Sequence, residues 1–493
     1  MQAVKINKDD SVAVALEDLK ASQSINIDSK DITLQDDIKR GHKFALHDIN
    51  AGENIIKYGF AIGSATTCIK AGEHVHSHNV KTNLGAINGY SYCPQSLKEL
   101  PKKQRSFQGY VRDNGDVGIR NEIWIIPTVF CVNQIARELE LYIKDKIADI
   151  DNIDEACALT HPYGCSQMGE DQQSTLRLLA SLASHPNAAA VIILGLGCEN
   201  NNIEVFKQYL NLDDTRLFFL NTQDVDDELE EAYAIADRAI ELAQKCSRSS
   251  VPVSKLRIGL KCGGSDGLSG ISANPLIGYL SDVVIGSGGT SVMTEVPEMF
   301  GAEQLLMNRC ESKEVFDNCV NLINNFKHYF TSHGQTISEN PSPGNKAGGI
   351  TTLEDKSLGC VQKGGSAAVC DVLEYTQRVH RHGLNLLNAP GNDGVSCTAL
   401  AAASCHLILF STGRGTPFAT VVPTVKIATN TALFNKKNNW IDFNAGEIVQ
   451  GKSFEELTDE LLDFVIDVAS GLKTKSEKRG IHEIIIWKDG VTM

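Results

Sequence analysis

The sequence of 493 residues has no long apolar run. Its longest strongly apolar stretch, AAAVIILGLG, covers residues 188–197. This is about half of the roughly 20 residues that a helix needs to cross a bilayer. The first residues alternate short apolar runs with charges, and they lack the basic and apolar regions of an export signal. We therefore expect neither membrane insertion nor export.

The chain also lacks an excess of basic residues. It contains 46 Lys plus Arg against 61 Asp plus Glu, so its formal net charge is −15. Such a field repels nucleic acid and anionic lipid. A few cations or helix N-termini can still make one cleft attractive to a small anion. We expect a small anionic substrate and no nucleic-acid or membrane partner, while homo-oligomerisation is left open.

Internal repeats, low-complexity tracts and a disulfide-type spacing of cysteines are absent as well. The 14 cysteines are scattered through a large acidic chain. This pattern favours free thiols, a few of which serve a metal or catalysis, over a disulfide framework. A reducing, cytoplasmic location fits it best.

The pattern of apolar and polar residues changes along the chain. Residues 1–95 carry short β-like runs broken by Gly and Asp turns, which predicts a small β-rich module. Residues 96–108 are polar and contain no apolar period, which predicts a linker. Strand-like and helix-like runs then alternate over 109–250 and over 256–493. This alternation predicts two α/β domains with mainly parallel sheets.

Four runs in the last region are predicted strands that end in small or polar residues: SDVVIGSG (281–288), SAAVCDVL (366–373), LNLLNAPG (384–391) and CHLILFSTG (405–413). In open α/β sheets, ligands bind where strands end and loops begin. The glycine-rich ends of these runs are therefore the expected site.

Two nucleotide-binding patterns fail in detail. After GLG at 195–197, Asn200 stands where the dinucleotide fingerprint needs its third glycine. This weakens the reading as an NAD-dependent dehydrogenase. The run GEIVQGKS (446–453) matches the phosphate-loop pattern, but only 40 residues remain after it. We expect Ser453 to cap the following helix instead, in a capping box with Glu456.

The stretch AGEHVHSHN (71–79) spaces three histidines two residues apart. On a strand, His74, His76 and His78 would all face one side. Neutral imidazoles ligate Fe, Zn, Mn or Ni. His42, in RGHKFAL, is a further candidate ligand in the same module. The alternative is a row of solvated histidines on an edge strand.

Three cysteines follow strand-like runs inside glycine-rich loops: Cys165, Cys198 and Cys262. A thiolate at the carboxyl end of a strand can be held by backbone N–H groups. Three converging thiolates could hold an iron–sulfur cluster that leaves one iron open to a substrate hydroxyl. Alternatively, each cysteine only fills a tight turn.

Two further loops, rich in Gly and Pro, each carry one cation. Lys346 lies in NPSPGNKAGG and Arg414 in FSTGRGTP. Such loops can bring backbone N–H groups and one cation onto a carboxylate, which Arg binds bidentately. Turn chemistry with a solvated charge is the alternative.

Taken together, these motifs resemble the altronate and galactarate dehydratase family. They occur in one order along almost the whole chain: RGHKFAL, AGEHVHSHN, HPYGCSQ, GLGCENN, CGGSDGLSGISANP, TEVPEMFGAE, NPSPGNKAGGITTLEDKSLGC and STGRGTP. The histidine-rich stretch and EDKSLGC resemble the altronate branch. The resemblance implies an N-terminal SAF-like β-clip domain, two α/β domains and iron-dependent conversion of D-altronate to 2-dehydro-3-deoxy-D-gluconate.

In the implied reaction, removal of the C2 proton beside the carboxylate gives an enediolate. The enzyme has to stabilise this enediolate and assist departure of the C3 hydroxyl. Two metal assignments stay open. One is Fe²⁺, partly replaceable by Mn²⁺, at His42, His74 and His76. The other is an iron–sulfur cluster at the three cysteines.

The remaining roles fall on three side chains. His161 and Lys346 are candidate acid–base groups, and Arg414 is the candidate carboxylate clamp. A related hexonate or hexarate such as galactarate is an alternative substrate. Rival classes are an NAD-dependent sugar-acid dehydrogenase and a carbohydrate-binding protein without activity.

Overall fold

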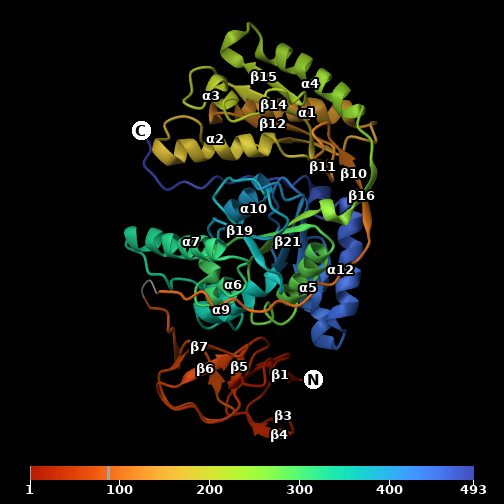
Figure 1. The fold of residues 1–493 in the computed structure, drawn as a ribbon. Coiled ribbons are helices and arrows are strands. Elements are labelled where there is room, and N and C mark those ends of the chain that lie inside the picture. The colour runs from red at the N-terminus through yellow and green to blue at the C-terminus, as the bar shows by residue number, and fades with distance from the viewer. Residues whose placement is uncertain (1, 86–88) are drawn as a thin grey trace.

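A computed structural model of the chain, which describes residues 2–85 and 89–493, contains three modules. The N-terminal module, red to orange in Figure 1, and the middle domain, with α1 to α4, lie at opposite ends of the C-terminal domain. The C-terminal domain therefore contacts both of the others.

The N-terminal module is built from short antiparallel strands. One sheet has the order β1-β2-β5-β8, a second β6-β7-β9, and β3 and β4 form a hairpin. Their bounds are β1 Ala3–Val4, β2 Val12–Ala15, β3 Ser24–Ile27, β4 Lys30–Thr33, β5 Lys43–Ala45, β6 Asn54–Lys57, β7 Phe60–Ala65, β8 His74–Val75 and β9 Val80–Lys81. Exposed and buried residues alternate strictly along β3, as a strand with one solvated face requires. The expected β-rich module is confirmed.

A small antiparallel sheet follows, with the order β11-β10-β16. It consists of β10 (Ser106–Val111), β11 (Val117–Gly118) and β16 (Ser249–Pro252). Phe107 of β10 is paired with Val251 of β16. The last residues of the expected linker therefore pair with the segment at the expected boundary between the two α/β domains, near residue 250.

The middle domain has a four-stranded parallel sheet with the order β13-β12-β14-β15. Its elements are β12 Glu122–Pro127, η1 Phe130–Val132, α1 Asn133–Ile147, β13 Glu155–Ala158, α2 Gly169–Ala183, β14 Ala188–Gly195, α3 Ile203–Lys207, β15 Leu217–Asn221, η2 Thr222–Asp224 and α4 Glu228–Gln244. Every residue of β12 and β14 is buried. This explains their nearly continuous apolar runs, because helices cover both faces of the sheet.

The C-terminal domain has a seven-stranded parallel sheet with the order β19-β20-β18-β17-β21-β22-β23. Its strands are β17 Arg257–Cys262, β18 Thr290–Met293, β19 Val369–Leu373, β20 Gly383–Leu387, β21 Leu407–Thr412, β22 Thr424–Ala428 and β23 Phe443–Asn444. Its helices are η3 Val253–Lys255, α5 Ala273–Gly286, η4 Val296–Met299, α6 Glu303–Met307, α7 Lys313–Ser332, α8 Pro343–Ala347, α9 Leu353–Cys360, η5 Val361–Gly364, α10 Asp393–Ala402, α11 Thr431–Lys436, η6 Ala445–Gln450, α12 Phe454–Ala469 and η7 Glu477–Arg479. The strand order reverses between β17 and β21, so their carboxyl ends form the crevice where such sheets bind ligands.

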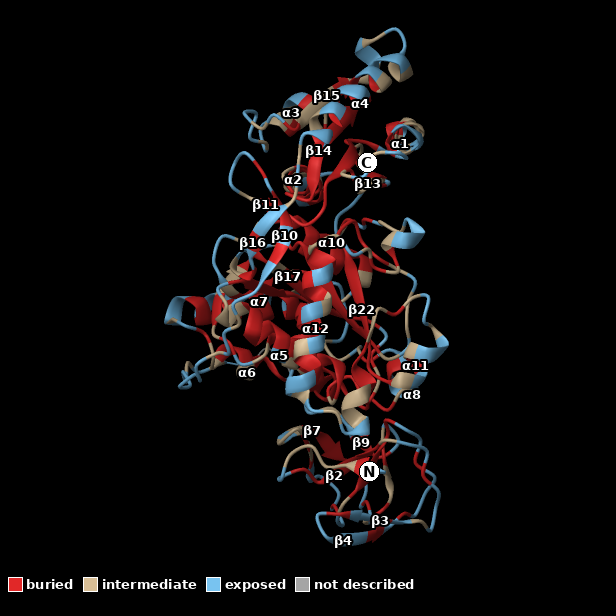
Figure 2. Cartoon of the chain, turned by 90° about the vertical axis from the view of Figure 1, so that its right-hand side faces the viewer, coloured by how far each residue is buried: buried red, intermediate tan, exposed pale blue. Residues whose placement is uncertain are grey.

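Burial follows this architecture. Figure 2 shows buried residues concentrated in the C-terminal sheet and the helices that flank it. The expected fold class, a β-clip module followed by α/β domains, is confirmed. Among the described residues, every helix is too short or too polar to span a bilayer.

Two local expectations have different outcomes. The run 281–288 is not a strand, because residues 281–286 form the end of α5. A short apolar run cannot by itself distinguish a strand from a buried helix segment. The side chain of Ser453 accepts the backbone N–H of Glu456 at the start of α12. The expected N-cap is therefore confirmed at this position.

Candidate active site

The N-terminal module docks onto the C-terminal domain by a close approach of backbones. Gly41 has a φ of +83°, and a Cβ at this position would lie 3.0 Å from the carbonyl oxygen of Gly348. A Cβ at Gly267 would lie only 1.9 Å from the carbonyl oxygen of Gly41. Glycine is required at these positions, and the approach brings the next residue, His42, beside α8.

Three imidazoles gather at this interface. His42 lies with its ring centre 5.1 Å from that of His74 and 5.0 Å from that of His76. The ring centres of His74 and His76 are 5.5 Å apart. His42 comes from the turn before β5, and His74 lies opposite Phe44 on the neighbouring strand β8. The structure thus brings together the three histidines that the sequence singled out as ligands.

Main-chain carbonyls of α8 fix two of these rings. His42 Nε2 donates to the carbonyl oxygen of Ala347 at 3.3 Å, and His76 Nε2 donates to that of Lys346 at 2.9 Å. In neutral imidazoles the Nδ1 atoms then carry the lone pairs. His42 Nδ1 lies 3.0 Å from His74 Nε2, and His76 Nδ1 lies 3.2 Å from the hydroxyl oxygen of Thr351.

The cluster holds its imidazoles neutral. Burial, reinforced by the repulsion that would arise if His42 were protonated as well, lowers the pKa of His74 to about 3. Burial and nearby Lys43 lower the pKa of His76 to about 4, and burial also lowers the pKa of His42. Neutral imidazole is the form that binds metal ions.

The predicted single strand face is wrong in detail. Strand β8 ends at Val75, and His76 and His78 lie in the bend and turn that follow. The turn directs His76 toward Thr351, and exposed His78 has its ring centre 5.4 Å from that of His74. The arrangement of the three rings therefore depends on a strand end and on a second domain.

A buried ion cluster anchors the same interface. The carboxylate of Asp355 on α9 lies 2.8 Å from Lys43 Nζ and 2.9 Å from Lys57 Nζ, and all three side chains are buried. Asp355 also accepts the backbone N–H of Thr351, the residue whose hydroxyl contacts His76. Burial would raise the pKa of Asp355, but the two ammonium groups outweigh it and hold the pKa well below its usual value.

The carboxyl ends of β17 and β21 carry two further functional groups. Asp266 accepts hydrogen bonds from the hydroxyls of Thr429 and Ser269 at 3.0 and 3.1 Å, and burial raises its pKa. Arg414 is exposed and packs beside Gly264. Within residues 2–85 and 89–493, no carboxylate forms an ion pair with Arg414. Its guanidinium is therefore available to an anion.

The main chain and the side chain of Lys346 have different surroundings. Its carbonyl oxygen holds His76, while its side chain is exposed. In the described part of the chain, its ammonium group makes no ion pair. Because its carbonyl oxygen contacts His76, Lys346 is a candidate acid–base residue next to the histidine cluster.

The other expected acid–base group lies elsewhere. His161 is buried in the middle domain, where its Nε2 donates to the carbonyl oxygen of Pro127 at 2.8 Å. Its Nδ1 accepts the backbone N–H of Tyr163 at 3.2 Å. Both ring nitrogens are therefore engaged by the backbone, an arrangement that suits a structural histidine.

The three expected cysteine ligands are distributed over two domains. Cys165 and Cys198 lie on adjacent loops of the middle domain, which are joined by a hydrogen bond from Asn201 N to Gly164 O. Cys262 instead ends β17 in the C-terminal domain. Among the described residues, the one group of His, Cys, Asp or Glu with all ligand atoms within 4.8 Å of one another comprises Cys262, Glu298 and Cys360.

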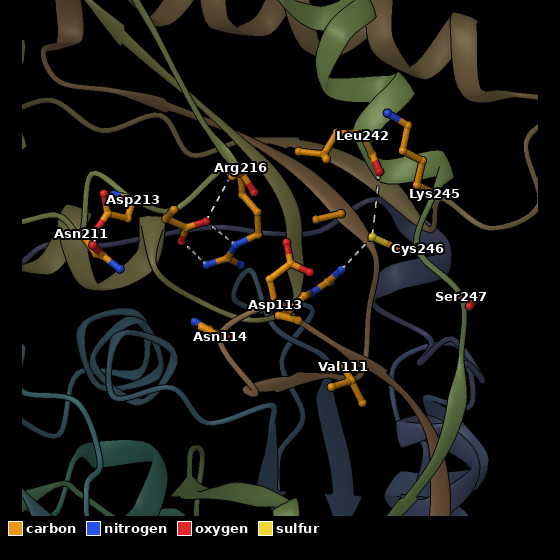
Figure 3. Close-up of a pocket in the computed structure, with 14 residues that line it drawn as sticks. Val111, Asp113, Asn114, Asn211, Asp213, Arg216, Leu242, Lys245, Cys246 and Ser247 are labelled. Atoms are coloured by element: carbon orange, nitrogen blue, oxygen red, sulfur yellow. Dashed lines mark hydrogen bonds and ion pairs between the residues drawn. The ribbon is translucent and has the colours of Figure 1, made fainter.

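A large cavity lies away from all of these groups. Its volume is about 590 Å³, and it adjoins the amino ends of β14 and β15 in the middle domain (Figure 3). Arg216 lines it, but its guanidinium is already paired with Asp214 at 2.6 Å. This is the opposite edge of the sheet from the one where ligands normally bind.

Sequence reasoning missed the supporting residues of the site. Asp355 and Cys360 lie in the stretch EDKSLGC, which had been noted only for its resemblance, and Asp266 lies in CGGSDG. The polar residues that follow predicted strand ends were the available signal. The residues that contact them from other helices and strands had no recognisable sequence signal.

Comparison with known proteins places the chain in one family along its whole length. The profile described as "Altronate/galactarate dehydratase SAF domain" matches residues 1–83. That of "D-galactarate dehydratase/Altronate hydrolase, second domain" matches 109–244, and that of "D-galactarate/Altronate dehydratase, C-terminal" matches 253–492. The chain belongs to the altronate/galactarate dehydratase family.

Individual relatives cover the same length. The altronate dehydratase of Escherichia coli (strain K12) is 50% identical over 496 residues, covering 100% of both chains. That of Bacillus subtilis (strain 168) is 50% identical over 494 residues and 99% of both chains. The galactarate dehydratase (L-threo-forming) of E. coli is 32% identical over 503 residues, covering 97% of this chain and 95% of its own.

Proposed function

We propose that this protein is a hydro-lyase that removes water from D-altronate to give 2-dehydro-3-deoxy-D-gluconate. The observation that carries the proposal is the neutral cluster of His42, His74 and His76, held at a domain interface beside the loops of the C-terminal sheet. The full-length 50% identity to two altronate dehydratases supports the choice of substrate.

The pair His42 and His74 offers two ligands to a divalent metal such as Fe²⁺. Metal-bound histidines characteristically donate their second ring N–H to a carbonyl or carboxylate, which fixes the tautomer. The carbonyl oxygens of Ala347 and Lys346 do this for His42 and His76. His42 Nδ1 and His74 Nε2, 3.0 Å apart, would be the first two ligands of the ion. The ring nitrogens of His76 do not lie within 4.8 Å of both, so His76 would have to move closer to add a third donor.

Imidazole sites select weakly among similar ions, so Mn²⁺ would partly replace Fe²⁺. When bound, the ion would supply a Lewis acid for the negative charge that develops on the substrate. The iron–sulfur alternative has less support, because Cys262 lies in a group that includes neither Cys165 nor Cys198.

The residues of the chain divide the remaining work. Arg414, exposed at the carboxyl end of β21, would bind the substrate carboxylate through its planar fork. Lys346 on α8 and Asp266, whose pKa is raised by burial, are the groups that would take the C2 proton and protonate the departing C3 hydroxyl. Asp355 would position the site by holding Lys43 and Thr351.

The test compares three sugar acids. Iron-loaded enzyme is incubated separately with D-altronate, D-mannonate and galactarate, and the 2-keto-3-deoxy acid formed is measured. D-altronate should give the highest kcat/KM, and removal of iron with a chelator should abolish turnover until Fe²⁺ is restored. A higher kcat/KM with galactarate would overturn the substrate assignment.

The cellular location belongs to the same proposal. All 14 cysteines are free thiols, although several are exposed. Free thiols of this number persist in reducing compartments. A cytoplasmic location is therefore proposed for the enzyme.

A further inference from the structure

Two thiols and a carboxylate meet in the C-terminal domain, outside the histidine cluster. Cys262 Sγ lies 3.3 Å from Cys360 Sγ, although the two residues are 98 positions apart. Each sulfur lies 3.1 Å from the same atom, Glu298 Oε2. The three ligand atoms therefore form a nearly equilateral triangle.

The triangle has the dimensions of one face of a metal tetrahedron. A tetrahedral Zn²⁺ or Fe²⁺ binds thiolate sulfurs at about 2.3 Å, which places two such sulfurs roughly 3.8 Å apart. The observed separation of 3.3 Å is only slightly shorter. A small outward movement of the two side chains would admit an ion above the triangle.

The three ligands come from three separate elements. Cys262 ends β17, Glu298 lies in η4 and Cys360 ends α9. All three residues are buried, with exposed fractions of 1%, 4% and 4%. An ion at this position would cross-link the strand, the turn and the helix, which is the usual role of a closed structural site.

The charges around the triangle are balanced with or without the ion. Three buried ammonium groups and three carboxylates surround it, in the pairs Lys261–Glu295, Lys261–Asp393, Lys356–Glu298 and Lys363–Glu295. With both thiols protonated, the six charges cancel. A divalent ion that displaces the two thiol protons leaves the net charge unchanged, so its entry creates no uncompensated buried charge.

A second carboxylate lies next to the triangle. Glu295 Oε1 lies 3.7 Å from Cys262 Sγ. Glu295 has a φ of +68° and a ψ of +54°, a left-handed conformation that is costly for a residue with a side chain. This backbone directs its carboxylate into the cluster, where it accepts the backbone N–H of Cys262.

We propose that Cys262, Cys360 and Glu298, with Glu295 as the fourth ligand, bind one thiophilic divalent ion, Zn²⁺ or Fe²⁺. The site differs from the histidine cluster in its ligands, its burial and its role. It stabilises the start of the loop that carries Asp266, and it takes no part in turnover.

The experiment reads the ligands of the bound ion directly. Full-length protein is expressed with supplementary Zn²⁺, dialysed, and examined by metal analysis and X-ray absorption spectroscopy at the zinc edge. The expected result is a sulfur shell at about 2.3 Å and about one tightly held ion per chain. A spectrum with nitrogen and oxygen neighbours alone would overturn the proposal.

Variants separate this site from the histidine cluster. Cys360→Ser should lose the sulfur-bound ion, and the matched control Cys397→Ser, at a buried thiol of the same domain, should keep it. The double variant His42→Ala/His74→Ala should also keep it, whatever happens to activity. If Cys360→Ser retains the full sulfur shell, the proposal is wrong, and if the variant does not fold, the wild-type spectrum still decides.

Discussion

His42 Nδ1 and His74 Nε2 lie 3.0 Å apart, although the two residues are separated by 32 positions. The antiparallel pairing of β5 and β8, which sets Phe44 opposite His74, brings them together. The second ring nitrogen of His42 is held by a carbonyl of another domain. Neither ring can turn away without the loss of a hydrogen bond, so the pair is preorganised for a ligand.

Removal of the imidazole of His74 or His76 should release the proposed Fe²⁺ ion. We expect His74→Ala and His76→Ala to lose bound Fe²⁺ and at least about tenfold in kcat/KM, since even residues behind metal ligands cost roughly 10- to 100-fold. Iron analysis and steady-state kinetics measure both effects. The control is His328→Ala, an exposed residue on α7. Unchanged iron content in both histidine variants would contradict the assignment.

The histidine cluster should make the metal-free protein sensitive to acid. The pKa values of His74 and His76 are lowered to about 3 and about 4, whereas unfolded histidine titrates near 6.5. Between these values the unfolded chain binds more protons, so the free energy of unfolding falls as the pH drops from about 7 to about 4. Urea midpoints of metal-free wild type and His74→Ala/His76→Ala should converge toward pH 4. If the urea midpoints of the two proteins fall in parallel with pH, other groups cause the loss of stability.

Arg414→Lys should lower kcat/KM by at least about tenfold, or about 1.4 kcal/mol. Lysine keeps the charge but loses the planar fork that binds a carboxylate bidentately. Arg238→Lys, on α4 of the middle domain, is the matched control and should leave the kinetics unchanged. If Arg414→Lys retains wild-type kcat/KM in a folded protein, the guanidinium does not clamp the substrate.

Asp355→Asn should destabilise the docking of the N-terminal module. The substitution leaves the ammonium groups of Lys43 and Lys57 buried without a counter-charge, and breaking a buried pair in this way costs about 3–5 kcal/mol. Urea unfolding measures the loss, with Asp213→Asn at an exposed site as the control. A shift as small as that of the control would show that water reaches the two lysines.

Local patterns predicted much of the fold. The alternation of strand-like and helix-like runs expected after residue 109 begins with β12, which follows from a buried apolar run, and continues with the amphipathic helix α1. The run 281–288 misled because α5 is buried around much of its circumference, which removes the polar face that marks a helix. Strand and helix periods thus identify elements only where one side meets water.

The site was less accessible to sequence reasoning, because its geometry depends on contacts between distant segments. The spacing of His74 and His76 indicated a metal site, but the role of Ala347 and Lys346 lies in their carbonyls, which no side-chain pattern marks. Cys262 was grouped with two cysteines in similar loops. Its neighbour in space is Cys360, which follows no strand and ends a helix.

The carbonyl contacts of α8 also determine which kinds of mutation can reveal that this helix is needed for function. Any amino acid placed at position 346 or 347 retains the main-chain oxygen that His42 or His76 uses. A scan of single substitutions across Pro343–Ala347, apart from Lys346 with its proposed acid–base side chain, would therefore score much of this helix as tolerant. Insertion or deletion of one residue would rotate the carbonyls by about 100° around the helix axis, and such changes should abolish function even at positions where substitutions are accepted.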